Sequence, residues 1–323
     1  MILLLGGNGY IGQAFQVELK RRHKPFLSVA RKDLNYAQFD SLREFLGVHK
    51  PELVVNAAGV TGRPNVDACE LARAETLAGN TLLPQTIAHA CSVWRIPWGH
   101  ISSGCIYAGA KLRRGATTQV VKDLTTPELR TATVTSPELI LGFSEMDQPN
   151  FTFRAGPCSF YSGAKALGEE ALAGTGPGYV WRLRIPFDEF DGARNYLSKV
   201  QRYAKVYDNV NSLSHRADFA AACLDLWEKR AAFGVYNVTN PGFVTARQVI
   251  ALIEKWLKPK RQFEFWVNDA EFYRDVARAP RSNCVLDVTK LLAAGVRIRP
   301  VLEALEHSLR HWQPERMEEN PQI

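Results

Sequence analysis

Three residues whose types and spacing suit proton transfer to a carbonyl oxygen stand in the first two thirds of the chain. Tyr161 and Lys165 lie in Tyr161-Ser162-Gly163-Ala164-Lys165, and residues four apart share one face of a helix. An ammonium beside a phenol can lower the phenol pKa toward the range useful for proton transfer. Ser103 follows an expected strand, where its hydroxyl could hold the oxygen that receives the proton. Together the three residues predict reduction of a carbonyl by hydride transfer.

A glycine-rich segment at the start of the chain predicts where the hydride donor binds. Gly6, Gly9 and Gly12 follow an apolar run at 2–5 and open an amphipathic helical pattern. Bare backbone can approach a pyrophosphate there, and the helix N-terminus stabilises its charge. This order of elements favours dinucleotide binding over an ordinary glycine turn. The expected contacts are Gly6, Asn8, Gly9, Tyr10, Ile11 and Gly12.

The residues after the second expected strand select between the two nicotinamide dinucleotides. An acid at this position accepts from the ribose 2'-hydroxyl of NAD, whereas a cation meets the 2'-phosphate of NADP. Arg31 and Lys32 stand here, followed by Asp33. Because a guanidinium matches phosphate bidentately, we expect NADP(H), with Asp33 as the NAD-type alternative. The other expected cofactor contacts are Ala57, Ala58 and Gly59 at the end of the third strand, Pro186 after the fifth, and Tyr161 with Lys165.

These residues require an α/β fold with a doubly wound parallel (Rossmann) sheet and a smaller C-terminal substrate-binding lobe. Short apolar runs at 2–5, 26–30, 53–56, 98–102 and 179–184 alternate with helical periodicity, which is typical of such a sheet. One long helix is expected at 71–94, with Pro84 as a local irregularity. We assign 1–184, joined by about 215–240, to the cofactor-binding domain, and 185–214 with 241–312 to the lobe. Residues 108–150 are expected to be a surface excursion or lid, and 313–323 a flexible tail.

The composition indicates the charge of the binding partners but not their identity. The 323 residues carry 40 Lys and Arg against 33 Asp and Glu, a net charge of +7, which favours anionic partners. The basic runs match helix ends and linkers, so nucleic acid is not expected. No apolar run reaches the roughly 20 residues that span a bilayer, and we expect a cytoplasmic protein. The six cysteines lack a C-x-x-C pair, and His307 with His311 lacks a third ligand, so we expect reduced thiols and no metal.

Longer motifs carry a resemblance to a known family. They are Asn56-Ala57-Ala58-Gly59-Val60-Thr61-Gly62-Arg63-Pro64-Asn65-Val66-Asp67, Gly104-Cys105-Ile106-Tyr107, Arg194-Asn195-Tyr196 and Ala279-Pro280-Arg281-Ser282-Asn283. With them the chain resembles the extended short-chain dehydrogenase/reductases, and among these the dTDP-4-dehydrorhamnose reductase group with its plant-type bifunctional 3,5-epimerase/4-reductases. The stretch between Ala108 and Ser159 is longer than in those plant enzymes.

The resemblance implies an NADPH-dependent oxidoreductase of rhamnose biosynthesis. Its nucleotide-sugar substrate would be a nucleoside-diphosphate-4-keto-6-deoxyhexose, reduced at C4 and epimerised at C3 and C5. The chain could also form a homodimer. The family's epimerisation residues match Cys105 and Lys199, and if the backbone stays extended after Ser103, Cys105 faces the same side. Motif position makes Ser103, Asn65, Asn195 and Arg281 candidate substrate contacts, with a structural hydrogen-bonding role as the alternative for the last three.

Two other functions fit part of the pattern. One is an NADP-binding regulatory subunit without catalysis, which needs the glycines but not the proton-transfer set. The other is an NAD-dependent nucleotide-sugar epimerase or dehydratase that recycles tightly held cofactor. The joint presence of Ser103, Tyr161, Lys165, Cys105 and Lys199 favours the reductase over the regulatory subunit.

Overall fold

A six-stranded parallel sheet forms the centre of the computed structural model, which describes residues 1–314. Its order is β13-β8-β4-β3-β1-β2, and every neighbouring pair is parallel. The strands are β1 (Ile2–Leu5), β2 (Phe26–Val29), β3 (Leu53–Asn56), β4 (Trp98–Ser103), β8 (Gly178–Leu183) and β13 (Gly234–Asn237). The order reverses at β1, with β2 on one side and β3 on the other. Ligands of such sheets bind at the carboxyl ends of the strands beside this reversal.

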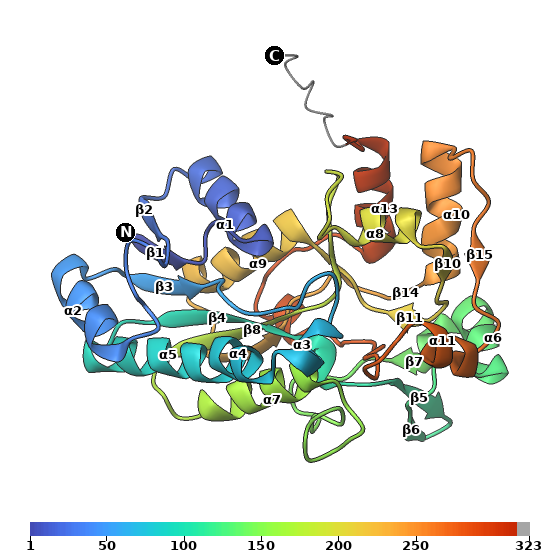
Figure 1. Cartoon of the computed structure of the whole chain (residues 1–323), viewed down its shortest axis with the longest axis horizontal. Helices are drawn as coiled ribbons and strands as arrows, with labels where there is room; N and C mark the ends of the chain where they lie inside the picture. Colours follow the sequence, from blue (N-terminus) through green and yellow to red (C-terminus); the bar gives the residue numbers. More distant parts are fainter. Residues whose placement is uncertain (315–323) are drawn as a thin grey trace.

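Helices cover both faces of the sheet, as Figure 1 shows. One face carries α1 (Tyr10–Arg21) and α9 (Arg216–Glu228), whose apolar side chains pack in one core with Phe15, Trp181 and Phe219. The other face carries α2 (Phe39–His49) and α5 (Leu83–Val93) around a second core. Helix α7 (Phe160–Ala171) lies beside them. The predicted doubly wound α/β fold is confirmed.

The helix expected at 71–94 is broken into four pieces. They are α3 (Ala68–Leu71), α4 (Arg73–Leu77), the π-helical η1 (Ala78–Leu82) and α5. The irregularity therefore precedes Pro84, which sits in the first turn of α5. In the wide π turn, Asn80 is fully buried, accepts from the Val60 N–H at 3.2 Å and donates to the Val60 carbonyl at 2.7 Å. The break thus fixes the backbone that follows β3.

The second lobe is built mainly by residues after Arg184. Its core joins α8 (Tyr196–Arg202), α10 (Ala246–Leu257) and α13 (Val301–Arg310) through buried residues such as Leu197, Ile253 and Leu305. The short helix α11 (Asp269–Asp275) also lies in the segment assigned to the lobe. The short helix α12 (Thr289–Ala293) instead packs against the central sheet: its Leu291 lies in the same core as Phe15 and Trp181, so the expected assignment of all of 241–312 to the lobe is wrong for α12. The short strands are β9 (Pro186–Phe187), β10 (Lys205–Val206), β11 (Val210–Asn211), β12 (Ser214–His215), β14 (Val244–Thr245) and β15 (Glu264–Phe265).

The excursion at 108–150 belongs to this second lobe. It forms an antiparallel sheet with α6 (Pro127–Thr135) and the 3-10 turn η3 (Pro137–Leu139), and its core includes Val210 and Val285. The sheet order is β6-β5-β7, from β5 (Ala110–Arg114), β6 (Thr117–Val121) and β7 (Ile140–Leu141). The expected boundary, with everything before 184 in the cofactor-binding domain, is therefore wrong for this segment, because its apolar residues pack against the lobe.

The predicted C-terminal tail, 313–323, can be compared with the structure only at its start. Gln313, placed in the predicted tail, bridges to Phe190: its N–H donates to the Glu189 carbonyl at 2.8 Å, and its carbonyl accepts from the Asp191 N–H at 2.8 Å. The rest of the predicted tail, 315–323, lies outside the described residues.

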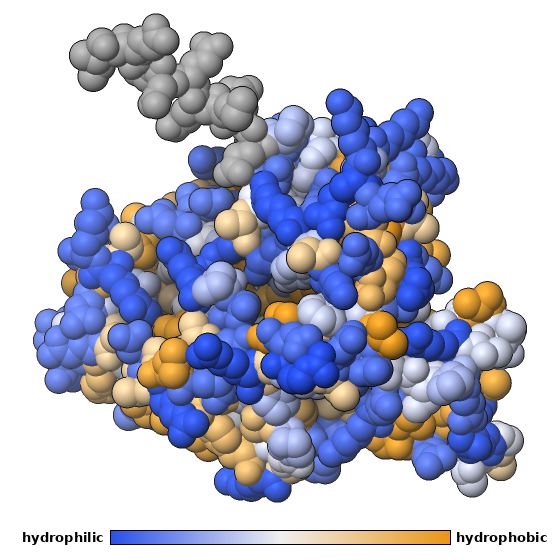
Figure 2. All heavy atoms as spheres, turned by 45° about the vertical axis from the view of Figure 1, so that its right-hand side comes forward, coloured by the Kyte–Doolittle hydropathy of each residue, from blue (hydrophilic) through white to orange (hydrophobic). Residues whose placement is uncertain are grey.

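The surface and the cysteines add two observations. On the face drawn in Figure 2, hydrophobic side chains occur in small groups among hydrophilic ones, which is ordinary for a folded domain. Among residues 1–314, no helix has both the length and the apolar character to cross a membrane. All six cysteines are free thiols.

Candidate active site

The glycine-rich loop between β1 and α1 forms a cradle of bare backbone. Gly6 has a φ of +77°, and a Cβ there would lie 2.5 Å from the Ala58 nitrogen. A Cβ on Gly12 would lie 2.2 Å from the Gly6 carbonyl oxygen, so α1 begins directly against the loop. Helix α1 has no side-chain cap and no acid in its first turn, which leaves its N-terminal N–H groups for an anion. These features fit a dinucleotide pyrophosphate.

The end of β3 lies next to this cradle and is held rigidly. The Asn56 side chain accepts from the Ala58 N–H at 3.0 Å and lies 3.0 Å from Nδ1 of His100, both side chains being buried. Because the Ala58 N–H fixes the amide oxygen, the Asn56 NH2 group faces His100. Burial, aided by the charge of Lys165, holds the pKa of His100 well below its usual value. The neutral imidazole can then accept this hydrogen bond, and Ala57, Ala58 and Gly59 stay in place beside the loop.

Two predicted cofactor contacts lie in segments close after strands. Arg31 is exposed two residues past β2, with its guanidinium 5.8 Å from the centre of the Tyr36 ring. Pro186 is partly buried in β9, three residues past β8. Both therefore follow strands of the central sheet.

The proton-transfer set converges at the carboxyl end of β4. Ser103 ends β4, and Tyr161 and Lys165 lie in α7. The Ser103 side chain acts on Tyr161 and opposes the rise of its pKa. Lys165 is 5% exposed and donates from Nζ to the Ile101 carbonyl at 3.2 Å. A Cβ on Gly59 would lie 3.6 Å from this Nζ, so the ammonium also reaches the cofactor side of the site.

Burial sets the protonation of both α7 groups. It raises the pKa of Tyr161 well above its usual value, with Cys105 and Cys69 adding to the rise and Ser103 opposing it. Burial also lowers the pKa of Lys165 to about 8. The expected lowering of the phenol pKa by Lys165 is therefore wrong for this structure, because burial raises this pKa and Lys165 is not among the main groups that act on it. Tyr161 is a protonated phenol at neutral pH, ready to donate.

Cys105 lies beside this set, but not on an extended strand. The backbone turns after β4 into a 3-10 turn, η2 (Gly104–Ile106), and the Ser103 hydroxyl accepts from the Cys105 N–H at 3.2 Å. The condition of an extended backbone after Ser103 is therefore not met, yet the turn keeps the thiol in one cluster with Tyr161 and Cys284. Burial raises the pKa of Cys105, and hydrogen bonds to Ser103 and Ser162 oppose the rise.

Lys199 lies in α8 among other cations. Burial and the charge of Arg194 lower its pKa. Burial and the charge of Arg63 lower the pKa of Arg194, and Tyr161 acts to raise it. The Nη1 of Arg194 donates to the Thr61 hydroxyl at 2.8 Å. A group of three cations, Arg63, Arg194 and Lys199, thus faces the site from both lobes. None of the three has an ion-pair partner among residues 1–314.

Three predicted substrate contacts have other partners. Asn195 is fully buried, caps α8, and donates to the Asp188 carbonyl and carboxylate and to the Phe190 carbonyl, all at 2.7–2.8 Å. Its expected substrate contact is not supported, because its amide is already used inside its own loop. Arg281 makes two hydrogen bonds of 2.6 and 2.7 Å to Asp67. Asn65 is exposed and accepts from the Asp67 N–H at 2.8 Å.

The sequence prediction missed two buried arginines at the end of β8. Arg182 pairs with Glu169 at 2.6 Å, and Glu169 also accepts from Ser102 at the end of β4. Arg184 is buried without a carboxylate partner among the described residues. The only local signal was their position at the carboxyl end of a predicted strand.

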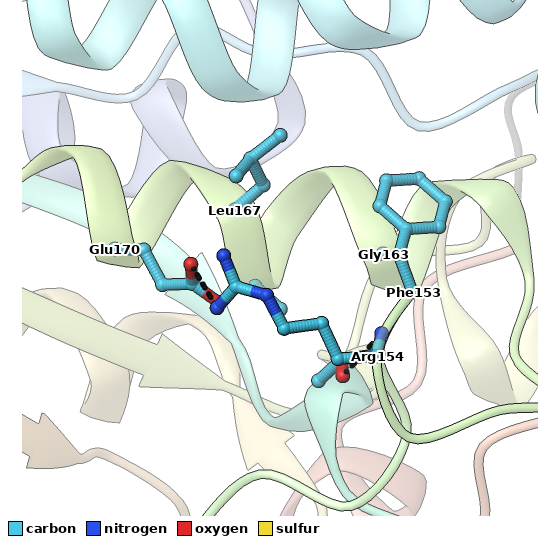
Figure 3. A pocket seen from close by; sticks show the side chains of 7 residues that line it. Phe153, Arg154, Gly163, Leu167 and Glu170 are labelled. Atoms are coloured by element: carbon cyan, nitrogen blue, oxygen red, sulfur yellow. Dashed lines mark hydrogen bonds and ion pairs between the residues drawn. The ribbon is translucent and has the colours of Figure 1, made fainter.

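A shallow pocket outside α7 is separate from this site. Figure 3 shows Phe153, Gly163 and Leu167 lining it, with an ion pair of 2.7 Å between Arg154 and Glu170 across it. Gly163, Leu167 and Glu170 share the helix face opposite Tyr161 and Lys165. The loop at 152–158 therefore covers the outer face of α7. Within residues 1–314, no group of three or more His, Cys, Asp or Glu side chains is arranged to hold a metal ion.

Known proteins share both the sequence and the fold. A family model described as the RmlD substrate binding domain matches residues 1–130. The bifunctional dTDP-4-dehydrorhamnose 3,5-epimerase/dTDP-4-dehydrorhamnose reductase of Arabidopsis thaliana is 33% identical over 261 residues, which cover 79% of this chain and 75% of the plant protein.

Two solved structures match nearly the whole chain. The L780 UDP-rhamnose synthase from Acanthamoeba polyphaga mimivirus has a TM-score of 0.79 at 20% identity, over 96% of this chain and 98% of that one. A dTDP-4-dehydrorhamnose reductase from Bacillus anthracis str. Ames, solved in complex with NADP, has a TM-score of 0.73 at 18% identity, over 96% and 97%. At these identities the structures establish the shared fold. The identity to the plant protein shows that this chain belongs to the dTDP-4-dehydrorhamnose reductase family, which confirms the resemblance in its sequence.

Proposed function

We propose that the protein uses NADPH to reduce the 4-keto group of a nucleoside-diphosphate-4-keto-6-deoxyhexose, and that it also inverts C3 and C5 of this sugar. The product is a rhamnose-type nucleotide sugar. The observation that carries the reduction is the convergence of Ser103, Tyr161 and Lys165 beside the glycine cradle and Gly59. Family membership supports the substrate class, since the plant relative is named as a dTDP-4-dehydrorhamnose 3,5-epimerase and reductase.

NADPH, when bound, supplies the hydride. The loop at 6–12 and the N-terminus of α1 would hold its pyrophosphate, and Arg31 its 2'-phosphate. Lys165 lies where its ammonium can bind the nicotinamide ribose from beside Gly59. The fit is supported by the open helix terminus and the absence of acids in its first turn.

Reduction places a developing negative charge on the C4 oxygen, and two hydroxyls meet it. Ser103 holds the oxygen by donating a hydrogen bond, and Tyr161 gives up its phenolic proton to form the alcohol. Because burial raises the pKa of Tyr161, the phenol is protonated before the reaction. Lys165 then stabilises the phenolate until a proton from solvent restores it.

The diphosphate of the sugar nucleotide is assigned to Arg63 and Arg194, the two arginines of the cation group, whereas Lys199 serves the epimerisation. Like charges repel, so a group of cations without acidic partners is suited to an anionic ligand. Arg194 and Tyr161 interact electrostatically, which supports a diphosphate site near the proton donor. Arg281, held by Asp67, is excluded from direct phosphate contact in this proposal and instead joins the two lobes.

Epimerisation uses the acidity of the protons next to the ketone. The Cys105 thiolate takes a proton from C3 or C5, the C–H electron pair becomes a C=C bond, and the carbonyl pair moves onto O4 as an enolate. Ser103 and Tyr161 donate hydrogen bonds to that oxygen. A proton returned to the opposite face from Lys199 inverts the centre, and exchange with solvent restores both groups.

The test is NADPH oxidation, followed at 340 nm, with dTDP- and UDP-4-keto-6-deoxyglucose as substrates. Tyr161→Phe should lower turnover by about 10²–10⁴-fold, the usual contribution of a general acid, while NADPH binding measured by fluorescence is retained. Undiminished turnover in this variant would refute the assigned proton donor. No oxidation by the wild-type protein with either sugar would favour a regulatory NADP-binding subunit. Tightly held NAD after gentle purification would favour a recycling epimerase or dehydratase.

A further inference from the structure

Arg184 is a buried cation whose neighbours do not balance its charge. It follows β8 directly and is 6% exposed. Its Nη2 donates to the Asn211 side-chain oxygen at 2.6 Å and to the Ser282 carbonyl, which are both neutral acceptors. Its Nε is buried and has no acceptor among residues 1–314. A buried charge without a counter-charge is unfavourable, so this guanidinium points to an anion that forms beside it.

Arg182 shows that a buried arginine in this part of the fold can have a counter-charge. It lies two residues earlier, within β8, and is 4% exposed. Its guanidinium makes an ion pair of 2.6 Å with Glu169 and a hydrogen bond of 3.1 Å to the Tyr107 hydroxyl. One of the two arginines at the end of β8 is therefore neutralised, and the other is not.

Strand pairing places Arg184 next to the turn that carries Cys105. Leu183 pairs with Ser103, so the chain segments after β8 and β4 begin side by side. The same Asn211 oxygen that binds Arg184 accepts from the Cys284 N–H at 3.1 Å. Cys284 then contacts the Gly104 carbonyl through its sulfur at 3.3 Å. These contacts join Arg184 to the backbone immediately before Cys105.

The charges around Cys105 come from several elements. Arg184 acts to lower the pKa of its thiol, as does Lys165 from α7. Lys199, the other epimerisation residue that the family resemblance implies, is not among the main groups that act on this thiol. The titratable groups facing Cys105 are Lys165, Tyr161, Arg184, Cys69, Cys158 and Cys284.

We propose that Arg184 is the positioning residue that stabilises the Cys105 thiolate, and thereby makes this thiol the base that removes the proton from C3 or C5. This inference rests on the proposed epimerase function. The guanidinium stays charged at every working pH, so it opposes the rise that burial causes in the Cys105 pKa and increases the fraction of thiolate present before the substrate reacts. The thiolate then takes the carbon-bound proton and becomes a thiol, with the electron pair left in the enolate. Lys165 alone would not suffice above its pKa of about 8.

The charge and the hydrogen bonds of Arg184 can be separated by substitution. Arg184→Gln keeps a donor for Asn211 and Ser282 but removes the charge, whereas Arg184→Lys keeps a charge. Arg182→Lys is the matched control, since it disturbs an equally buried arginine whose charge Glu169 offsets. The Cys105 thiolate is followed by its ultraviolet absorbance near 240 nm over a pH series, as the difference between each variant and the same variant carrying Cys105→Ser.

Arg184→Gln should raise the titration midpoint of Cys105 by about one pH unit or more, as expected on removing a nearby opposite charge. Arg184→Lys should restore most of the shift. At neutral pH, deuterium incorporation at C3 and C5 from deuterated water, measured by NMR without NADPH, should fall about tenfold in Arg184→Gln. Reduction of the already epimerised 4-keto sugar should change much less.

Two results would overturn the assignment of Arg184. One is a Cys105 titration in Arg184→Gln that coincides with wild type, and the other is an equal shift in Arg182→Lys. Because the titration needs no substrate, it remains decisive if exchange is lost through misplacement of the sugar. Absence of deuterium incorporation by the wild-type protein would instead show that the epimerase part of the proposed function is wrong.

Discussion

At the scale of single residues, burial decides the chemistry more than spacing does. Tyr161 and Lys165 were predicted from their separation of four residues, and the structure brings them to Ser103. The separation did not reveal how strongly burial shifts both groups, because burial depends on β4, α7 and the segment after β3 packing together. For the same reason the role of Arg184 could not be predicted from the sequence. A single arginine after a strand gives no local sign that it is buried without a counter-charge.

The shifted pKa of Lys165 predicts the pH dependence of reduction. Lysine is charged below its pKa, and burial lowers this pKa to about 8. The turnover number for reduction should therefore be constant below about pH 8 and fall at higher pH, as the ammonium that stabilises the Tyr161 phenolate loses its proton. Stopped-flow measurement of NADPH oxidation over a pH series checks this.

In Lys165→Arg the guanidinium keeps its charge over the same range, so any residual activity should lose the alkaline decline. An unchanged decline in that variant would assign it to another group.

Arg31 predicts the choice of cofactor. Arg31→Ala removes a charge-assisted contact with the 2'-phosphate, so it should weaken NADPH binding by roughly 10–100-fold, the range for a hydrogen bond to a charged group. NADH binding should change little. Fluorescence titrations with both cofactors measure the difference. Arg43→Ala, which removes a partly buried arginine paired with Asp40 on α2, is the control and should affect neither cofactor.

At the scale of elements, the site depends on how closely α7 approaches the broken helix before it. A Cβ on Gly168 would lie 2.2 Å from the Asn80 carbonyl oxygen. Asn80 in turn holds Val60, next to the cofactor contacts. One close contact therefore sets the distance between Lys165 and the end of β3.

Gly168→Ala should separate these elements. We expect a loss of about 1–3 kcal/mol in the free energy of unfolding, typical of overpacking against backbone, together with a lower turnover number. Urea denaturation and steady-state kinetics measure the two effects. Gly192→Ala is the control, since nothing lies within 4 Å of its added methyl group. Equal stability of both variants would show that α7 can shift without cost.

The elements predicted best are those with local signals. The strand at 2–5, the glycine loop and the helix that follows were predicted because apolar runs and glycines are adjacent in the sequence. The strands at 110–114 and 117–121 were missed, since β6 is largely exposed and polar and lacks an apolar alternation. The break of the helix at 78–82 was placed at Pro84 instead, because the contacts of Asn80 lie 20 residues away.

At the scale of the whole molecule, one ion pair joins the segment after β3 to the second lobe. Burial alone would raise the pKa of Asp67, but Arg281 and the Ala279 N–H outweigh it and hold the pKa below its usual value. The stabilisation is therefore present at neutral pH and is lost as the pH falls through this lowered pKa. Sequence could not predict this pair, since its members are 214 residues apart.

A double-mutant cycle with Asp67→Asn and Arg281→Gln should give a coupling energy of about 1–3 kcal/mol in urea unfolding. The Michaelis constant for the sugar nucleotide should rise in both single variants, because the lobes that enclose it are less well held. A coupling energy near zero would mean that the two charges act independently. Repeating the cycle at acidic pH, where Asp67 is protonated, should reduce the coupling.

The hydrogen bond between Arg194 and Thr61 also spans the two lobes, and it has a thermodynamic consequence. Thr61 lies two residues past Gly59, a predicted cofactor contact, whereas Arg194 belongs to the cations assigned to the sugar nucleotide. A ligand that draws Arg194 away from Thr61 changes the segment that the other ligand binds. Linkage requires the effect to be mutual: whatever factor NADPH imposes on the affinity for the sugar nucleotide, the sugar nucleotide imposes on the affinity for NADPH.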